Sequence, residues 1–283
     1  MQANKKTKIM TTLSLCILLF TADIHSVYAE PDKTYSFGIV PQFEAKKLRR
    51  IWMPILKQLE EKTGFKFKLI GAPTIPAFEK ELLSGKFDFS YMNPFHLLIA
   101  NESQGYMPLL RDHSKKLQGV LVVREDSDIK SVKDLNNKTI AFPSPNALGA
   151  SLQMRAELHD KFNISIKPVY VKTHDSVYLN VYLKQTAAGG GVGKTLKKQK
   201  NQLRNALKVI YKTAPVSPHP VAVHPRVPKQ DRKKIVDAFF ELSNSTDGQK
   251  LLAGIPIKKL GKASLENYKS LEAMKLKRFF VSN

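Results

Sequence analysis

The chain has 283 residues, with 46 lysines and arginines against 24 aspartates and glutamates, which gives a formal net charge of +22 at pH 7. Its one cysteine, Cys16, excludes an intrachain disulfide and a metal site built from several thiolates. A strongly basic surface favours anionic partners, which include small oxyanions, anionic lipid headgroups and nucleic acid. Charge alone does not identify the partner, because lysines on a protein surface can also simply be solvated and bind nothing.

The first thirty residues have the layout of a secretory signal peptide. A basic start with three lysines precedes a short apolar run at 13–20, and residues 27–29 (Val-Tyr-Ala) are typical of a cleavage site. The run is too short to span a bilayer, although a retained membrane anchor is the alternative. We therefore predict that residues 1–29 are a cleaved signal peptide and that the mature protein is periplasmic. Export argues against a nucleic-acid partner, and the mature charge is +20 because the removed segment holds three lysines and Asp23.

The first part of the mature chain alternates predicted strands and helices. An apolar stripe from Leu48 to Leu59 predicts a core-facing helix, which Pro54 is expected to kink or divide. In chain order we expect a strand at 35–40, this helix closed by Gly64, a strand at 65–69, a helix at 76–84, a strand at 87–92 and a helix at 94–100. Such an order predicts a mainly parallel sheet covered by helices.

The pattern then repeats. We expect strands at 120–123, 139–142, 169–171, 187–191, 207–211 and 221–223, with helices capped by Ser131 and at 147–161, 174–184 and 194–205, and a mostly helical tail from Pro228 in which Thr246 caps a helix.

Two successive α/β units predict an α/β fold of two lobes joined by two crossing strands, 120–123 and 221–223. We expect the first lobe to hold residues 30–120 and 215–283, and the second lobe residues 121–214. In such architectures the ligand lies in the cleft at the carboxyl ends of strands, where helix N-termini point. Hinge closure of the lobes around the ligand is the expected motion.

Residues 188–195 (Ala-Gly-Gly-Gly-Val-Gly-Lys-Thr) fit a relaxed phosphate-loop pattern. One interpretation is a nest of backbone N–H groups with Lys194 around nucleotide phosphates, which would make the protein a nucleotide-binding or hydrolytic enzyme. Against it, the next apolar strand ends at Lys212 with no acidic residue to reach magnesium, and an exported protein meets little ATP. We favour a Gly-rich strand end that packs closely or approaches a ligand.

A second candidate site lies at residues 173–176 (Thr-His-Asp-Ser), after a predicted strand and at the start of a helix. Hydroxyls, an imidazole and a helix N-terminus together attract an oxyanion. Ordinary N-capping by Thr173 or Asp175 is an equal alternative.

Two more strand-to-helix junctions are candidate sites. Prolines at 143 and 145 stiffen the turn before the helix at 147, so that its N-terminus is presented rigidly. In the segment 88–95, Tyr91 and Asn93 are expected to reach the cleft, with a half-buried core position as the alternative for Tyr91.

The sequence offers no set of residues for a metal or for catalysis. His219 and His224 are five residues apart, which puts them on opposite faces of a strand, and no acidic ligand is near. His174 and Asp175 are adjacent and so poorly placed to orient one another as a catalytic pair. We therefore expect no metal, no cofactor and no enzymatic activity.

Taken together, these segments resemble the phosphate/phosphite/phosphonate substrate-binding proteins of ABC importers. The matching segments are 38–41 (Gly-Ile-Val-Pro), 88–94, 131–138 (Ser-Val-Lys-Asp-Leu-Asn-Asn-Lys), 143–147 (Pro-Ser-Pro-Asn-Ala), 174–177, 218–220 (Pro-His-Pro) and 247–252. The resemblance covers roughly residues 34–270, and the order and spacing of the segments are specific. It implies a type II periplasmic-binding fold with an oxyanion held between the lobes.

The resemblance also implies site residues. His174 and Asp175 match the family's cleft His-Asp pair, and Tyr91 matches its cleft tyrosine. Many phosphonate binders have Ser-Thr-Ser-Gly where this chain has Ala-Leu-Gly-Ala at 147–150, and an acidic residue is absent from 185–188 (Gln-Thr-Ala-Ala). The expected ligand-binding residues are Tyr91, Asn93, Ser144, Asn146, Ala147, Leu148, His174, Asp175 and Ser176, with backbone N–H groups acting at 147 and 148.

The expected partners are a small phosphonate-, phosphite- or phosphate-like anion and an importer permease in the inner membrane, and we expect a monomer. Docking of the closed form on a membrane sensor kinase is the alternative, which the sequence does not separate from transport. Binding of polyanions through charge alone is another; it should fade steeply with salt, whereas cleft recognition should not.

Overall fold

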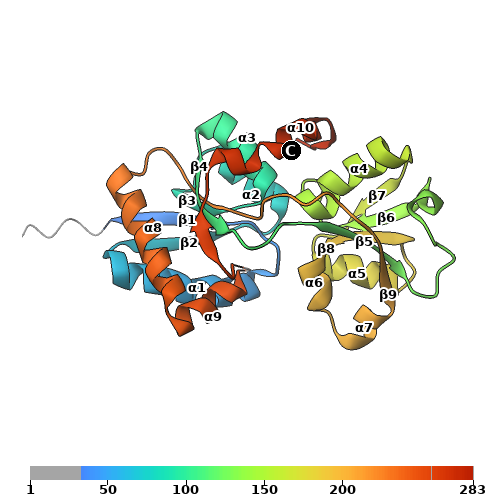
Figure 1. Cartoon of the computed structure of the whole chain (residues 1–283), viewed down its shortest axis with the longest axis horizontal. Coiled ribbons are helices and arrows are strands. Elements are labelled where there is room, and N and C mark those ends of the chain that lie inside the picture. Colours follow the sequence, from blue (N-terminus) through green and yellow to red (C-terminus); the bar gives the residue numbers. More distant parts are fainter. Residues whose placement is uncertain (1–32, 256, 283) are drawn as a thin grey trace, which may run out of the picture. The chain divides into compact units, whose positions relative to one another are not determined.

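The computed structural model describes residues 33–255 and 257–282. They form two β-sheets flanked by helices within one compact unit (Figure 1). The first sheet has the strand order β11-β4-β10-β3-β1-β2, and the second has β7-β6-β8-β5-β9. We call each sheet with its helices a lobe. Within the described part of the chain, no helix has the length and hydropathy needed to cross a membrane.

The strands are β1 (Thr34–Ile39), β2 (Lys66–Gly71), β3 (Phe89–Tyr91), β4 (Met107–Asp112), β5 (Gly119–Arg124), β6 (Thr139–Phe142), β7 (Lys167–Tyr170), β8 (Ala188–Val192), β9 (Leu207–Lys212), β10 (Val221–Val223) and β11 (Leu260–Lys262). The α-helices are α1 (Ala45–Thr63), α2 (Ile75–Leu83), α3 (Pro94–Gln104), α4 (Gln153–Phe162), α5 (His174–Tyr182), α6 (Gly193–Lys197), α7 (Asn201–Asn205), α8 (Lys229–Asn244), α9 (Thr246–Gly254) and α10 (Ser270–Ala273). Shorter 3₁₀ turns are η1 (Val132–Leu135), η3 (Leu265–Tyr268) and η4 (Leu276–Phe279), and η2 (Leu148–Leu152) is a π-turn that runs directly into α4.

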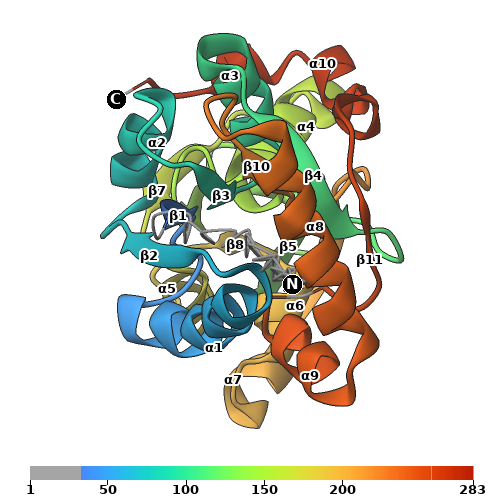
Figure 2. The same cartoon turned by 90° about the vertical axis from the view of Figure 1, so that its left-hand side faces the viewer.

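Helices cover both faces of the first sheet (Figure 2). On one face α1 packs with α8 and α9, and Phe37 of β1 meets Trp52 of α1 with ring centroids 5.2 Å apart. On the other face lie α2 and α3, which contact each other. Pro54 does not divide α1, which continues through it from Ala45 to Thr63. Because proline has no N–H, the carbonyl of Arg50 loses its partner in the helix. Both Pro54 and Arg50 are exposed, so water can bond to that carbonyl.

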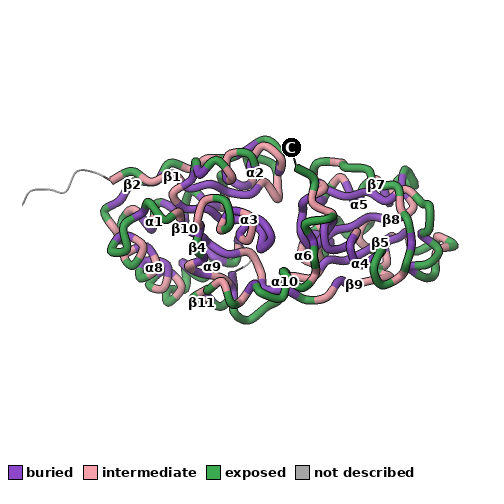
Figure 3. Tube along the Cα trace, turned by 90° about the horizontal axis from the view of Figure 1, so that it is seen from above, coloured by how far each residue is buried: buried purple, intermediate pink, exposed green. Residues whose placement is uncertain are grey.

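The inner strands β5, β6 and β8 of the second sheet are mostly buried, so they are largely apolar, whereas the edge strands β7 and β9 are more exposed (Figure 3). Successive side chains point to opposite faces of a strand. Leu121 and Val123 of β5 therefore belong to one core cluster with Met154 of α4, whereas Val120 and Val122 pack in another with Val177 and Tyr178 of α5.

Two chain segments cross between the lobes, one from β4 to β5 and one from β9 to β10. They pair through an isolated antiparallel bridge in which Leu117 and Val216 exchange N–H···O bonds of 2.8 and 2.9 Å. The expected crossing strands at 120–123 and 221–223 do not themselves cross. Instead β5 belongs wholly to the second sheet and β10 wholly to the first, and the crossings are the short loops before them.

The C-terminal segment makes further contacts between the lobes. Arg155 of α4 donates to the carbonyl of Phe279 at 2.8 Å, and Asp160 forms an ion pair with Arg278. Val281 exchanges two bonds with the side chain of Asn146, at 2.8 and 3.0 Å. The tail of the chain thus ties η4 to the start of the α4 helix.

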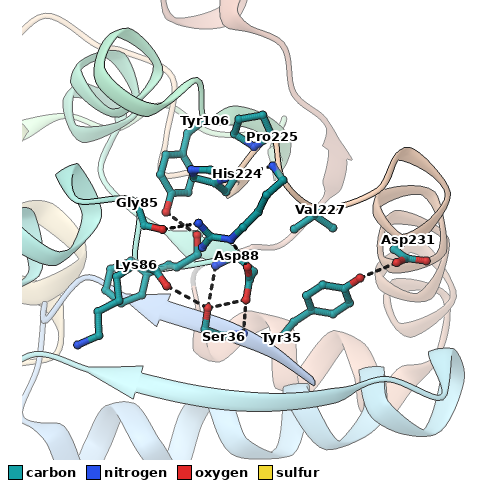
Figure 4. Close-up of polar contacts among 12 residues, drawn as sticks. Tyr35, Ser36, Gly85, Lys86, Asp88, Tyr106, His224, Pro225, Val227 and Asp231 are labelled. Carbon is teal, nitrogen blue, oxygen red and sulfur yellow. Dashed lines mark hydrogen bonds and ion pairs between the residues drawn. The ribbon is translucent and has the colours of Figure 1, made fainter. Parts of the chain in front are cut away.

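After the chain returns from the second lobe, a polar network holds it against the first sheet (Figure 4). The Asp88 carboxylate accepts from the N–H and the hydroxyl of Ser36 at 2.8 and 2.7 Å, and the Arg226 guanidinium contacts it at 2.5 Å. Arg226 also donates to the carbonyl of Gly85 at 2.6 Å. Burial by itself would raise the pKa of Asp88, but the bonds from Arg226 and Ser36 outweigh it and hold that pKa below its usual value.

Most of the expected elements are present, with a few corrections. The predicted helix at 194–205 is two short helices, α6 and α7, and the strands β4 and β11 were not predicted. Thr246 is the first residue of α9 rather than its cap, because the Ser245 hydroxyl accepts from the N–H of Gly248 at 3.0 Å. At η1 the expected capping box of Ser131 with Asp134 is confirmed.

Candidate functional site

A cavity lies where the carboxyl ends of strands from both sheets meet. It is lined by Val40, Gln42, Ile75, Asn93, Leu117, Ala147, Leu148, Gly149, Ala150, His174, Val192 and His219. These residues end or follow β1, β2, β3, β6, β7 and β8, or belong to the two crossing segments. The space open to the centres of water-sized groups is about 50 Å³. One water needs roughly 10–15 Å³ on this measure, so a tetrahedral oxyanion with one small substituent suits a space of this size.

Polar side chains of the first lobe reach the cavity from Asn93 and Gln42. Asn93 caps α3 by accepting from the N–H of His96 at 2.8 Å, and its amide donates across the cleft to the carbonyl of Asn146 at 3.2 Å. The Gln42 amide lies 2.6 Å from Nε2 of His219, which stands in the second crossing segment. Capping and pairing therefore fix these side chains at the cleft.

The second lobe presents backbone N–H groups at the start of η2. The N–H groups of Ser151 and Leu152 both bond to the carbonyl of Ala147, at 2.8 and 3.1 Å. Within residues 33–255 and 257–282, no acceptor bonds the N–H groups of Leu148, Gly149 and Ala150, and all three residues line the cavity. Free N–H groups at a helix start attract an anion, and the helix dipole adds to the attraction.

Glycines allow this helix start to lie directly on the second sheet. A Cβ on Gly119 of β5 would come within 1.9 Å of the Gly149 carbonyl oxygen, and a Cβ on Gly190 of β8 would come within 2.1 Å of that of Ala150. Because real Cβ atoms do not approach so closely, both strand positions must be glycine for η2 to sit where it does. The close-packing interpretation of the Gly-rich segment is confirmed.

Among the described residues that line the cavity there is no lysine, arginine, aspartate or glutamate. Burial lowers the pKa of His174 to about 4, and burial with the neighbouring His96 and His174 lowers that of His219 to about 3. Without a bound anion, both imidazoles at the cavity are therefore neutral hydrogen-bonding groups at pH 7.

Four of the expected ligand-binding residues line the cavity: Asn93, Ala147, Leu148 and His174. His174 is buried, and its Nδ1 has no hydrogen-bond partner among the described residues. Tyr91 lies behind the cavity wall; it is 4% exposed, its hydroxyl donates to the carbonyl of Ile255 at 3.1 Å, and its ring stacks on His219 at 5.4 Å. Its contact with the cavity is thus through His219.

The other four expected residues do not line the cavity. Ser144 is buried, and no group in the described part of the chain bonds its hydroxyl. Asn146 is fully buried, and its amide donates to the Glu79 carboxylate at 2.9 Å. Asp175 is exposed and accepts from Gln199 at 2.7 Å, whereas the Ser176 N–H bonds to the Thr173 hydroxyl at 3.1 Å. Thr173, not Asp175, caps α5.

Sequence reasoning missed several lining residues, of which Gln42 and His219 are the polar ones. Gln42 directly follows Pro41 at the end of the first strand, and His219 lies in the Pro-His-Pro segment at 218–220. Both segments were singled out, but neither side chain was assigned to the ligand. His219 and His224 lie apart: His219 lines the cavity, and His224 packs on Tyr106 with ring centroids 5.0 Å apart. Among the described residues, no group of three His, Cys, Asp or Glu side chains is placed to hold a metal ion.

Comparison with known proteins identifies the family. A family model described as "ABC transporter, phosphonate, periplasmic substrate-binding protein" matches residues 37–268, most of the chain. The chain belongs to this family. The predicted resemblance is therefore confirmed, and so are the two-lobed type II periplasmic-binding fold and the role of a substrate-binding component, which is not an enzyme. Membership implies a periplasmic protein with a small anionic ligand and a membrane permease as partners.

Individual relatives are distant. The phosphonates-binding periplasmic protein of Escherichia coli is 25% identical over 237 residues, which cover 79% of this chain and 70% of that protein. The phosphate-import protein PhnD of Mycolicibacterium smegmatis is 23% identical over 166 residues, 53% of this chain and 52% of that protein. The structure of PhnD1 from Prochlorococcus marinus, in complex with methylphosphonate, matches with a TM-score of 0.78 at 16% identity, over 87% of this chain and 98% of that one. That likeness concerns the fold.

The two cleft histidines predict that the binding protein loses stability in mild acid. Unfolded histidine titrates near 6.5, so between about pH 6.5 and pH 4 the unfolded chain binds more protons than the folded one. The free energy of unfolding should therefore have its full value above pH 6.5 and decrease as the pH falls. For one such histidine the decrease should reach roughly 3 kcal/mol near pH 4. Urea denaturation at pH 7 and pH 5 measures this. The double variant His174→Gln/His219→Gln should show a much smaller difference between the two pH values; an undiminished difference would refute the assignment.

Proposed function

We propose that this protein captures a small phosphonate-, phosphite- or phosphate-like oxyanion between its lobes and delivers it to an importer permease. The observation that carries the proposal is the row of unbonded N–H groups at Leu148, Gly149 and Ala150, three residues that line a cavity whose other lining side chains are neutral. Asn93 and Gln42 approach the same cavity from the first lobe, so a bound anion would bridge the lobes and favour closure.

The lining also supports a choice among such anions. Since no carboxylate from residues 33–255 or 257–282 lines the cavity, an ammonium group on the ligand would be buried there without an adjacent counter-charge. The PhnD1 structure named above contains methylphosphonate, whose substituent is a single methyl group. We therefore propose ligands of that size without an amine, in preference to aminoalkylphosphonates.

A calorimetric panel tests this function. We expect methylphosphonate, phosphite or phosphate to bind in isothermal titration and to raise the melting temperature, by linkage of binding to folding. His174→Ala should weaken the best ligand by about tenfold or more, because one hydrogen bond to a charged group contributes about 1.5–3 kcal/mol. His159→Ala, at an exposed histidine of α4 away from the cavity, is the matched control and should bind normally.

Two outcomes would count against the proposal. The first is no binding by any member of a panel that contains phosphate, phosphite, methylphosphonate and sulfate. The second is preferential binding of 2-aminoethylphosphonate over methylphosphonate, which would contradict the selection against an amine.

We also propose the finer arrangement of the chain. Residues 1–29, which lie outside the described residues, would be a cleaved signal peptide, as their basic start and short apolar run indicate. The lobes would comprise 30–120 with 215–283, and 121–214, and the working form would be a monomer. Mass spectrometry of the periplasmic protein with light scattering tests both; an uncleaved N-terminus or a stable dimer would be the opposing result.

A further inference from the structure

One part of the Gly-rich segment is not used by the cavity, namely its lysine. Lys194 is the second residue of the short helix α6 of the second lobe and is half-buried. Its Nζ donates to the carbonyl of Ala253, at the end of α9 in the first lobe, at 3.3 Å. The side chain therefore lies at the contact between the lobes, two residues beyond Val192 of the cavity wall.

Other lysines gather around the same contact. Lys198 of the second lobe and Lys47 of the first lie over one ring, that of Phe43, with Nζ 5.3 and 4.0 Å from its centroid. Phe43 follows Gln42, which lines the cavity. Lys115 and Lys258, on the side of the first lobe, interact electrostatically with Lys194. We call Lys47, Lys115, Lys194, Lys198 and Lys258 the cross-lobe lysines.

In the described part of the chain the cross-lobe lysines are not in ion-pair contact with a carboxylate, although Asp112 acts electrostatically on Lys194 and Asp175 on Lys198. By contrast, Lys233, Lys250 and Lys269 each pair with a carboxylate three or four residues away. The nearby Asp112 carboxylate is occupied by the hydroxyl and N–H of Ser114 and the N–H of Lys258.

Lys194 shows the cost of this arrangement. Burial, followed by the charges of Lys198 and Lys115, lowers its pKa to about 8. Like charges brought together from two lobes oppose their contact, and an anion placed between them would remove the repulsion. The same geometry thus makes anion binding and lobe closure mutually favourable.

We propose that the cross-lobe lysines form a second anion site beside the cavity, for a small oxyanion with two or more phosphate-like groups. Such an anion is long enough to contact lysines of both lobes and carries enough charge to balance several of them. The site goes beyond the proposed function and does not depend on which ligand occupies the cavity. Its effect would be to hold the lobes together from outside.

Pyrophosphate titrations of the whole protein test the second site. Wild-type protein should bind pyrophosphate and gain melting temperature above the gain in sodium chloride of equal ionic strength. The double variant Lys194→Gln/Lys198→Gln should bind it at least about tenfold more weakly, from the loss of hydrogen bonds to a charged group. Its affinity for the cavity ligand, measured without pyrophosphate, should not fall, because removing the two charges reduces the repulsion between the lobes. The control Lys233→Gln/Lys250→Gln removes the same charge from paired lysines and should behave as wild type.

Three results would overturn the second site. One is a pyrophosphate effect no larger than that of sodium chloride; another is equal weakening in the control, which would indicate net charge alone. The third is loss of pyrophosphate binding in His174→Ala but not in the lysine variant, which would place the anion in the cavity. Failure of methylphosphonate to bind, with pyrophosphate binding retained, would instead count against the cavity ligand alone.

Discussion

Gly190→Ala is expected to destabilise the protein severely, whereas Gly193→Ala, three residues along in the same Gly-rich segment, is expected to be nearly neutral. A Cβ at 190 would lie 2.1 Å from the Ala150 carbonyl oxygen and 2.5 Å from the Phe142 ring, but at 193 its nearest neighbour is 3.8 Å away. Overpacking against backbone costs about 3 kcal/mol or more, which lowers the melting temperature of a protein of this size by roughly 5–10 °C. Thermal unfolding of both variants measures the difference.

The same pair separates packing from phosphate binding. If the segment were a phosphate loop, both glycines would serve the approach of backbone to phosphate, and both variants would lose nucleotide binding with little change in stability. With packing as the cause, Gly190→Ala displaces η2 and also weakens the binding of the cavity oxyanion. Equal melting temperatures for the two variants would contradict the packing of β8 against η2.

Asn146→Ala is expected to have the second largest effect, on stability and ligand affinity together. Asn146 is fully buried, and its amide bonds the Glu79 carboxylate of α2 at 2.9 Å and the Val281 carbonyl at 2.8 Å. Its removal deletes a buried bond to a charged group and two bonds that help to hold the C-terminal segment, at a cost of about 3 kcal/mol. Because Asn146 joins the two lobes, the affinity for the oxyanion should fall as well.

Urea denaturation and calorimetry measure the two effects. Asn201→Ala is the control, since Asn201 is exposed on α7 and its side chain accepts from Arg204 of the same short helix. A variant at 146 that keeps wild-type stability would show that Glu79 and the C-terminal segment do not depend on this amide. A lower free energy of unfolding with a normal affinity for the oxyanion would show that the contacts of Asn146 stabilise the fold without favouring lobe closure.

The sequence predicts the fold well because its signals are local. The stripe from Leu48 to Leu59 predicts the buried face of α1, and continuous apolar runs predict the buried strands β5 and β6. The missed elements lack such signals. In β4 the alternation is interrupted by Pro108, and β11 has three residues, too few to show a period.

The site was less predictable because it is assembled from distant residues. Gln42 and His219 are 177 residues apart, and only the crossing of the chain between the lobes brings them within 2.6 Å. His174 and Asp175 were expected to act together, but neighbours on a helix point about 100° apart, and the structure has one buried and the other exposed. The N–H groups at 148–150 belong to the backbone, so no particular side chain marks them in the sequence. A sequence pattern locates the helix start, but it does not show how closely η2 approaches β5 and β8, which Gly119 and Gly190 permit.

The most direct measurement is a crystal structure of the protein with methylphosphonate. We predict the phosphonate in the cavity between the lobes, with its oxygens within hydrogen-bond distance of the N–H groups of Leu148, Gly149 and Ala150 and of His174. A phosphonate held instead by the cross-lobe lysines, with the N–H groups of η2 turned to water, would contradict capture of the anion by neutral donors in the cleft.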